Sequence, residues 1–279
     1  MKLIATTIQP ALTPPPTSVP RPLPRTLLPD LVRRNKLLLC LDYDGTLSEI
    51  TGRPADARPV LFARRVLAAL ATHHERIVVA IISGRDIDTL RRQLEIDRGL
   101  VLVGNHGLEY VDRDGHRHLV AGIENFQPNL EMVRDWMSKE IPRRSGFVIE
   151  DKRLTIALHY RNANPPAATA IRASLRKFLD RECPNLRILA GNKVDEVIPR
   201  DIGGKGSAVR RLLDSKLERD RVAVYIGDDV TDEDAFFALR DEGVTVRVGA
   251  LQRSWARYRV NGPSDVVAAL GDLVAALPG

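Results

Sequence analysis

Four short apolar runs limit what this chain can fold into more than any other feature of its sequence. They cover residues 37–42 (LLLCLD), 77–82 (IVVAII), 100–103 (LVLV) and 222–227 (VAVYIG). A strand that is apolar along its whole length is typical of a parallel sheet with helices on both faces. Amphipathic stretches at 59–72 and 86–97 follow the first two runs, and further helices are expected after Gly204 and at 232–240. The alternation predicts an α/β fold, a doubly wound, Rossmann-like parallel sheet.

The middle of the chain has a different pattern. A hairpin is expected at 108–120, and two helices, at 127–140 and 165–181, are each followed by a further hairpin, at 147–160 and 186–198. This order predicts a smaller α+β domain inserted into the parallel-sheet core. We expect residues 1–28 to form a Pro-rich mobile arm, residues 29–110 and 199–279 to form the core, and residues 111–198 to form the inserted domain.

Composition excludes several classes of protein. The net charge of +6 comes from Lys and Arg spread along the whole sequence, and aromatic residues are only 5%, so we expect no nucleic-acid partner. No apolar run reaches the roughly 18 residues that span a bilayer, and the first apolar stretch breaks too early for a secretory signal. Cys40 and Cys183 form neither a disulfide framework nor a metal-ligand pattern. We therefore expect a cytoplasmic protein without a membrane segment.

Asp42 and Asp44 end the first apolar run, in the sequence DYDGT. Ligands of open α/β sheets bind at the carboxyl ends of the strands, where this pair falls. Gly45 permits a turn that brings both carboxylates to one site, where one could attack phosphorus and the other could protonate a leaving oxygen. The simpler interpretation is a turn in which Asp accepts a bond from a backbone amide. The buried strand before the pair and Gly-Thr after it favour the chemical interpretation.

Three later features of the sequence, at Ser83, at Lys205 and at Asp228-Asp229, follow the same logic. Ser83 follows the second run and could bind phosphate together with free backbone amides, although helix capping would also explain it. Lys205 begins a helix after two glycines and could neutralise a phosphoryl oxygen, although an exposed lysine is commoner there. Asp228 and Asp229 follow the fourth run, where carboxylates could hold Mg²⁺. The helix dipole accounts for the acids at 232–234.

The order of these features resembles the haloacid-dehalogenase-like phosphatase superfamily over residues 36–110 and 199–250. The resemblance implies that Asp42 attacks phosphorus and that Asp44 acts as general acid and then as base. It implies a phosphate site formed by Thr46, Ser83, Gly84 and Lys205. It implies Mg²⁺ held by Asp42, Asp228 and the backbone carbonyl of Asp44, with Asp229 in support. The inserted domain would then be a cap that covers the site.

Several longer segments are similar to those of trehalose-6-phosphate phosphatases. They are LDYDGTLSEI (41–50), IISGR (81–85), GNHGLEY (104–110), HYR (159–161) and GDDVTDEDAF (227–236). The resemblance implies that the cap binds the sugar through Glu150, Lys152 and Glu196. His159 and Arg161 are further candidate contacts. A polar hairpin turn would also explain residues 150–152, and His159 and Arg161 could be ordinary strand residues.

The expected function is therefore Mg²⁺-dependent hydrolysis of trehalose 6-phosphate to trehalose and phosphate, through an aspartyl-phosphate, by a monomer. Three alternatives stay open. A phosphatase of the same capped class could act on sucrose phosphate or a glycosyl-glycerate phosphate by identical chemistry. A phosphate-receiver module would have similar acidic strand ends, but it would lack the large insertion and the second Asp of DYDGT. A phosphomutase more often carries its cap between the first two motifs.

Overall fold

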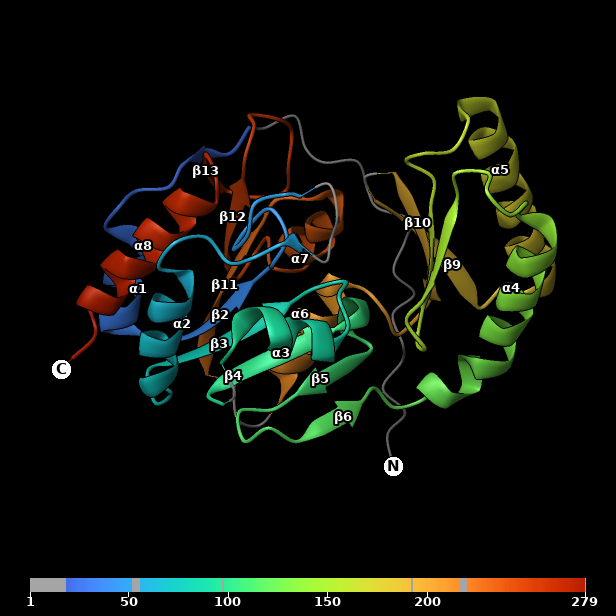
Figure 1. Cartoon of the computed structure of the whole chain (residues 1–279). Coiled ribbons are helices and arrows are strands. Elements are labelled where there is room, and N and C mark those ends of the chain that lie inside the picture. The colour runs from blue at the N-terminus through green and yellow to red at the C-terminus, as the bar shows by residue number, and fades with distance from the viewer. Residues whose placement is uncertain (1–18, 52–55, 97, 192, 216–219, 279) are drawn as a thin grey trace. The chain divides into compact units, whose positions relative to one another are not determined.

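The structure, a computed structural model, describes residues 19–51, 56–96, 98–191, 193–215 and 220–278. These residues form two compact units (Figure 1). The small unit comprises Leu119–Gly203, and the large unit comprises the described residues before and after it. The predicted parallel-sheet core with an inserted α+β domain is confirmed.

The large unit is built on one sheet with the strand order β1-β13-β12-β11-β2-β3-β4-β5-β6. In that order the strands are Arg21–Pro22, Tyr258–Val260, Val244–Val248, Arg221–Gly227, Lys36–Leu41, Ile77–Ile82, Leu100–Gly104, Glu109–Val111 and Arg117–Leu119. Neighbours from β1 to β4 run parallel, and β5 runs antiparallel to β4. The central strand β2 lies between β11 and β3, so the strand order reverses direction there.

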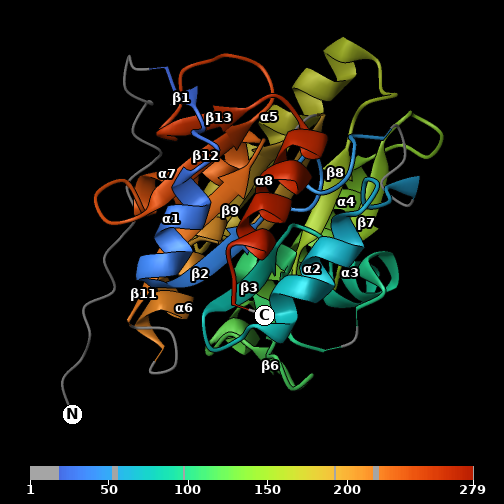
Figure 2. The same cartoon turned by 90° about the vertical axis from the view of Figure 1, so that its left-hand side faces the viewer.

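Helices cover both faces of this sheet because successive side chains of its strands point to opposite sides. Leu37, Leu39 and Leu41 of β2 pack with four helices: α1 (Leu27–Arg34), α2 (Ala63–Thr72), α3 (Ile87–Leu94) and α8 (Pro263–Ala275). Figure 2 views the molecule from the side of α1, α2 and α8. Leu38 and Cys40 pack instead with α6 (Lys205–Asp214) and residues of and next to α7 (Glu233–Ala238). The central strands are therefore buried on both faces, as the apolar runs predict.

The small unit has a separate core. Its antiparallel sheet has the order β7-β8-β10-β9, formed by Val148–Asp151, Ile156–His159, Val194–Pro199 and Leu186–Gly191. The helices α4 (Gln127–Glu140) and α5 (Pro165–Glu182) cover one face of this sheet (Figure 1). Ile156, Leu158 and Val197 point to the helices, so the alternate residues of the same strands lie on the opposite face.

Three sequence predictions need correction. Residues 19–28 are not part of a mobile arm, because β1 pairs with β13 and Leu28 is buried in the large unit; residues 1–18 lie outside the described residues. A two-residue edge strand tolerates Pro22, so the proline content was misleading. The β5–β6 hairpin extends the large sheet, although residues 111–118 were placed in the inserted domain. The helix expected from residue 59 begins at Ala63, because Phe62 has φ +68° and does not continue a helix.

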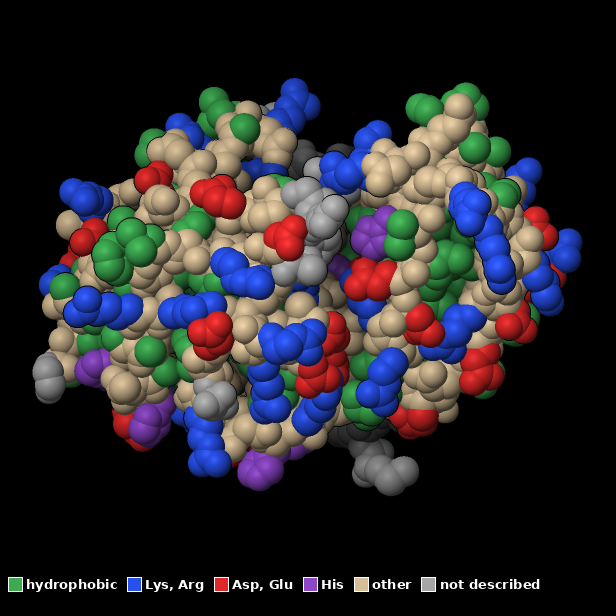
Figure 3. Space-filling view, viewed as in Figure 1, with side chains coloured by type: hydrophobic (Ala, Val, Ile, Leu, Met, Phe, Trp, Pro, Cys, Tyr) green, Lys and Arg blue, Asp and Glu red, His purple; other side chains and the backbone are tan. Residues whose placement is uncertain are grey.

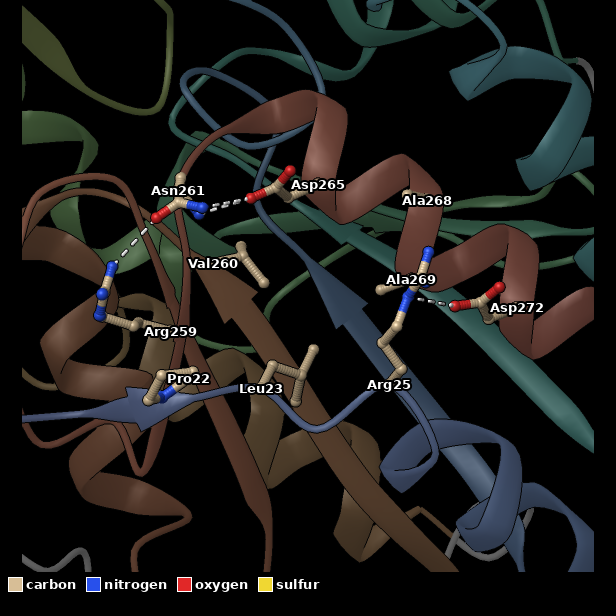
Figure 4. Close-up of a pocket in the computed structure, with 10 residues that line it drawn as sticks. All are labelled: Pro22, Leu23, Arg25, Arg259, Val260, Asn261, Asp265, Ala268, Ala269 and Asp272. Carbon is tan, nitrogen blue, oxygen red and sulfur yellow. Dashed lines mark hydrogen bonds and ion pairs between the residues drawn. The ribbon is translucent and has the colours of Figure 1, made fainter.

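A cavity of about 410 Å³ lies at the edge of the large unit, between β1, β13 and α8 (Figure 4). Its polar residues are already paired with one another. Arg25 approaches Asp272 at 3.8 Å, and Asn261 accepts from Arg259 and donates to Asp265. The cavity is separated from β2 by β12 and β11, so it is distinct from the acidic strand ends of the sequence analysis.

The surface carries charges of both signs. On the face shown in Figure 3, Lys and Arg side chains alternate with Asp and Glu over the large unit. Among the described residues, no helix combines the length and the apolar character that crossing a membrane requires.

Candidate active site

The predicted chemical residues of the core meet at one edge of the large sheet. Asp42 follows β2, Ser83 follows β3 and Asp228 follows β11, and these three strands are parallel neighbours. Lys205 is the first residue of α6. Because the strand order reverses at β2, the carboxyl ends of these strands form the type of crevice in which open α/β sheets bind ligands.

A buried network of charged side chains joins the end of β2, the start of α6 and the loop after β11. The Lys205 ammonium donates to Asp42 Oδ1 at 2.6 Å and to Asp232 Oδ1 at 2.7 Å. The hydroxyl of Tyr225 also donates to Asp232 Oδ1, at 2.7 Å. Asp42 and Lys205 are 4% and 3% exposed, and Asp232 is fully buried. One lysine thus holds two carboxylates in a part of the protein that excludes water.

Asp232 is a site residue that the sequence interpretation missed. The helix dipole explained it as one of three acids at a helix start, whereas its side chain is directed into the buried network. Its position three residues after Asp229 could have revealed it, because this is the spacing of a capping box, in which both side chains bond to the backbone of the same turn.

The protonation of the network follows from burial and charge. Burial raises the pKa of Asp42 well above its usual value, and Lys205 opposes that shift. Burial and the neighbouring Asp232 raise the pKa of Asp228 to about 7. Burial lowers the pKa of Lys205, but Asp232 and Asp42 outweigh it, so the pKa lies above its usual value. The lysine therefore stays charged, while burial and the close approach of the acids oppose ionisation of Asp42 and Asp228.

The donor set fits a hard divalent cation. One carboxylate oxygen each from Asp42, Asp228 and Asp232 lies within 4.8 Å of the other two. Oxygen ligands of this kind are those that Mg²⁺ prefers. Gly45, with φ +77°, leaves room for this arrangement, because a Cβ atom there would lie 2.1 Å from Asp228 Oδ2. The residues present therefore fit Mg²⁺.

Asp229 shapes the loop that carries the acids. Its backbone N–H donates to Asp232 Oδ2 at 2.9 Å, and its side chain caps the short 3₁₀ turn Val230–Asp232. Gly227 is required beside it, because a Cβ atom at that position would lie 2.3 Å from Asp232 Cγ. In this geometry the backbone and side chain of Asp229 hold Asp232 in place.

A second buried pair holds the backbone of the same loop. Arg247 of β12 donates to the carbonyl of Asp228 at 2.7 Å and to Glu233 Oε1 at 2.8 Å. Glu233 also accepts from the hydroxyl of Ser254 at 2.7 Å. The position of Asp228 thus depends on the neighbouring strand as well as on β11.

Asp44 is held by a residue that the sequence interpretation quoted but gave no role. Arg85 Nε donates to Asp44 Oδ2 at 2.6 Å, and Arg85 Nη2 donates to Asp44 Oδ1 at 2.6 Å. This is a bidentate pair, the strongest geometry that Arg and a carboxylate form. The other predicted phosphate residues lie close by in the fold, and Thr46 Oγ1 donates to Asp228 Oδ1 at 3.4 Å.

The GNHGLEY segment connects the loops of the site. The N–H of His106 donates to the carbonyl of Ser83 at 3.0 Å, and the N–H of Gly204 donates to the carbonyl of His106 at 2.7 Å. The backbone between Asn105 and Gly107 is left-handed throughout, with φ values of 48°, 54° and 94°. The ring of His106 covers Gly84, where a Cβ atom would lie 2.5 Å from the ring. This segment therefore fixes the Ser83 loop relative to the start of α6.

The predicted sugar-binding residues cluster in the small unit. The Lys152 ammonium donates to Glu196 Oε2 at 2.9 Å, and His159 Nε2 lies 2.8 Å from Glu150 Oε2. The hydrogen bond with His159 lowers the pKa of Glu150. Thr155, which was not predicted, donates to Glu196 Oε1 at 2.5 Å. The last predicted residue, Arg161, is exposed in the turn after β8.

These residues share one face of the small sheet. Glu150 and Glu196 are both paired with Ala157 of β8, one from each side. His159 is two residues further along β8, on the same face. The opposite face packs on α4 and α5. The cluster is therefore a polar group on the side of the sheet that these two helices do not cover, and it extends from the exposed Glu150 to the buried Glu196.

The fold and the site define a capped phosphatase of the haloacid-dehalogenase-like superfamily. Residues 40–264 match a family model described as trehalose-phosphatase. The chain therefore belongs to the trehalose-phosphatase family.

Individual relatives agree with this family. A trehalose-phosphate phosphatase of Mycobacterium marinum is 34% identical over 210 residues, which are 74% of this chain and 52% of that protein. An uncharacterized glycosyl hydrolase of Mycobacterium tuberculosis is 37% identical over 246 residues, which are 85% of this chain and 18% of that protein. The chain thus spans about half or less of the length of these relatives.

Solved structures show the same fold. The C-terminal domain of trehalose-6-phosphate phosphatase from C. albicans has a TM-score of 0.77 and 25% identity, covering 94% of this chain and 100% of that one. Trehalose-6-phosphate phosphatase from Aspergillus fumigatus has a TM-score of 0.69 and 28% identity, covering 92% of this chain and 100% of that one.

Proposed function

We propose that this chain is a Mg²⁺-dependent phosphatase that hydrolyses trehalose 6-phosphate to trehalose and phosphate through an aspartyl-phosphate on Asp42. The observation that carries the proposal is the buried pair of Asp42 and Lys205 at the carboxyl end of β2, with a bond of 2.6 Å. A carboxylate nucleophile needs a nearby cation, since the phosphoryl group that it attacks is itself an anion. Membership of the trehalose-phosphatase family supports the choice of reaction.

In the first step an Asp42 oxygen forms a bond to phosphorus while the bond from phosphorus to the sugar oxygen breaks. Asp44 donates a proton to that sugar oxygen. In the second step water forms a bond to phosphorus and the Asp42–phosphorus bond breaks, while Asp44 takes a proton from the water. Lys205 neutralises phosphoryl oxygens throughout, and the Thr46 and Ser83 hydroxyls and the N–H of Gly84 hold them in place.

The metal site of this proposal is formed by Asp42, Asp228 and the backbone carbonyl of Asp44. The structure adds Asp232 to the acids close to it. When bound, Mg²⁺ supplies the positive charge that the transferring phosphoryl group requires. Asp229 supports the site by capping the turn that carries Asp232.

The small unit is the proposed source of substrate specificity. Carboxylates can each accept hydrogen bonds from neighbouring sugar hydroxyls, and an ammonium adds donors. Glu150, Lys152 and Glu196 offer these groups on one face of the sheet, with His159 beside them and Arg161 in the turn that follows. The proposed ligand is a small sugar phosphate, bound by a monomer without a nucleic-acid or membrane partner. Cys40 and Cys183 are buried and form no disulfide, which fits the proposed cytoplasmic location.

Phosphate release from a panel of sugar phosphates tests the proposal. The chain should release phosphate from trehalose 6-phosphate faster than from sucrose 6-phosphate, glucose 6-phosphate or a glycosyl-glycerate phosphate. Exhaustive chelation should abolish this activity and added Mg²⁺ should restore it. A strong preference for another sugar would refute trehalose 6-phosphate as the substrate, and full activity after chelation would refute the metal requirement.

Changes in the small unit should affect the sugar ester selectively. Glu150→Ala and Glu196→Gln should each lower kcat/KM for trehalose 6-phosphate by about 5- to 150-fold, as expected for loss of one or two hydrogen bonds to a sugar. Hydrolysis of p-nitrophenyl phosphate should fall far less, because this ester has no sugar to bind. Both rates are measured by phosphate release from purified variants.

The matched control is Glu131→Gln, which changes an exposed carboxylate on α4 of the same unit. It should leave both rates unchanged. An equal loss on both esters in the test variants would mean that these residues maintain the unit and do not recognise the sugar.

A further inference from the structure

The geometry around Asp44 differs from that of an ordinary surface ion pair. Both Asp44 oxygens are bound, one by Arg85 Nε and the other by Arg85 Nη2, each at 2.6 Å. The Arg85 side chain is 10% exposed, while that of Asp44 is 43% exposed. The buried partner therefore fixes the plane and the rotamer of a carboxylate that solvent would otherwise leave free to rotate.

Arg85 is itself held on several sides. Its backbone N–H donates to Ser83 Oγ at 3.2 Å, and its carbonyl accepts from the N–H of Asn105 at 2.8 Å. Its guanidinium lies 5.4 Å from the ring centroid of Tyr43, a fully buried side chain. Burial lowers the pKa of Arg85, but the hydrogen bonds that it donates to Asp44 and the charge of that carboxylate outweigh it, so the guanidinium stays charged. The loop after β3 thus provides a rigid support for Asp44.

We infer that Arg85 is a positioning residue that aims the carboxyl group of Asp44 at the oxygen of the leaving sugar. The inference rests on the proposed function, in which Asp44 transfers the proton. For the transfer, one of the two Arg85 bonds is released so that one Asp44 oxygen carries the proton to the sugar oxygen, and the bond from Arg85 to the other oxygen keeps the carboxyl group in orientation. The planar guanidinium suits this task, whereas the ammonium of a lysine has no fixed plane.

The inference predicts a dependence on the leaving group. A sugar alkoxide leaves only with a proton, whereas p-nitrophenolate leaves without one. In Arg85→Gln, the ratio of kcat/KM for trehalose 6-phosphate to kcat/KM for p-nitrophenyl phosphate should fall by about 10- to 100-fold, because kcat/KM reports the step in which the alcohol leaves and proton transfer there is worth roughly 10²–10⁴ in rate. Arg85→Lys should recover part of that ratio. Turnover of both esters should also fall where hydrolysis of the aspartyl-phosphate limits kcat, because Asp44 takes the proton from water in that common step.

A double-variant cycle shows whether Arg85 acts through Asp44. In an Asp44→Asn background, Arg85→Gln should cause no further fall in the ratio, because the residue that it positions can no longer transfer a proton. If Arg85 had only a structural role, Arg85→Gln would cause the same loss in the Asp44→Asn background as in the unchanged protein. Arg64→Gln is the matched control, since it removes an Arg–carboxylate pair with Glu95 in the same unit, and it should leave the ratio unchanged.

Three results would overturn the inference. One is an equal loss of kcat/KM on both esters, which would place Arg85 on the phosphoryl group or in loop stability. Another is a ratio that stays the same or rises in Arg85→Gln. The third is a full additional loss in the Asp44→Asn background. Failure of the unchanged protein to hydrolyse either ester would overturn the proposed function together with the inference, and is distinct from these three.

Discussion

Asp42→Asn is expected to lower phosphate release by at least about 10⁴-fold, the order of loss seen when a covalent nucleophile is removed. The amide that replaces the carboxylate cannot attack phosphorus and is a poor ligand for a cation. The fold should survive, because burial already disfavours the charged form of Asp42 and Lys205 keeps its bond to Asp232. The measurements are phosphate release from trehalose 6-phosphate and the midpoint of thermal unfolding.

Asp30→Asn serves as the control, since it changes an exposed carboxylate of the same unit that pairs only across one helical turn with Arg33. It should retain full activity. Near-normal turnover in purified Asp42→Asn would refute the aspartyl-phosphate mechanism, whatever the substrate proves to be.

Lys205→Met is expected to damage both activity and stability. It leaves two buried carboxylates without their shared cation, and breaking a buried ion pair costs about 3–5 kcal/mol in the free energy of unfolding. Loss of the charge that faces the phosphoryl group should lower kcat by about 10²–10³-fold. Urea unfolding followed by circular dichroism measures the first effect, and phosphate release measures the second.

The stability loss in Lys205→Met should grow with pH. Lys205 is the group that opposes the raised pKa of Asp42, so its removal raises that pKa further. A carboxyl with a higher pKa in the folded state binds protons more tightly when folded, and stability then falls as pH rises above the unfolded pKa of about 4. The loss at pH 8 should therefore exceed the loss at pH 5. Lys36→Met, at the exposed start of β2, should show no such trend.

The central strands were predictable because both of their faces are buried, so that successive residues along each strand are apolar. All six residues of β3 are buried, and its bounds equal those of the second apolar run. The edge of the sheet was not predictable in this way. Only two residues of β1 and three of β13 pair there, so neither leaves a periodic pattern. Helix α8 was not assigned in the sequence analysis, although its buried face completes one layer of the core.

Within the site, the sequence identified the residues that directly follow a strand of the large sheet. Asp42, Ser83 and Asp228 each follow an apolar run, so their meeting follows from strand adjacency alone. Asp232 and Arg85 differ, because their partners come from distant parts of the chain. The bonds of Asp232 to Lys205 and of Arg85 to Asp44 depend on side-chain directions after folding, and for Asp232 the helix dipole offered a simpler local explanation.

The pairing of β2 with β11 also determines the order in which the chain can complete its structure during synthesis. Leu37 pairs with Val222, and the whole small unit is made between them. While the ribosome translates that segment, one edge of the central strand has no partner and is open to pairing with other chains. The small unit is continuous in sequence, so its own sheet can form early. The large unit can become complete only after the last strands emerge, which makes this protein dependent on late, long-range pairing for its solubility in the cell.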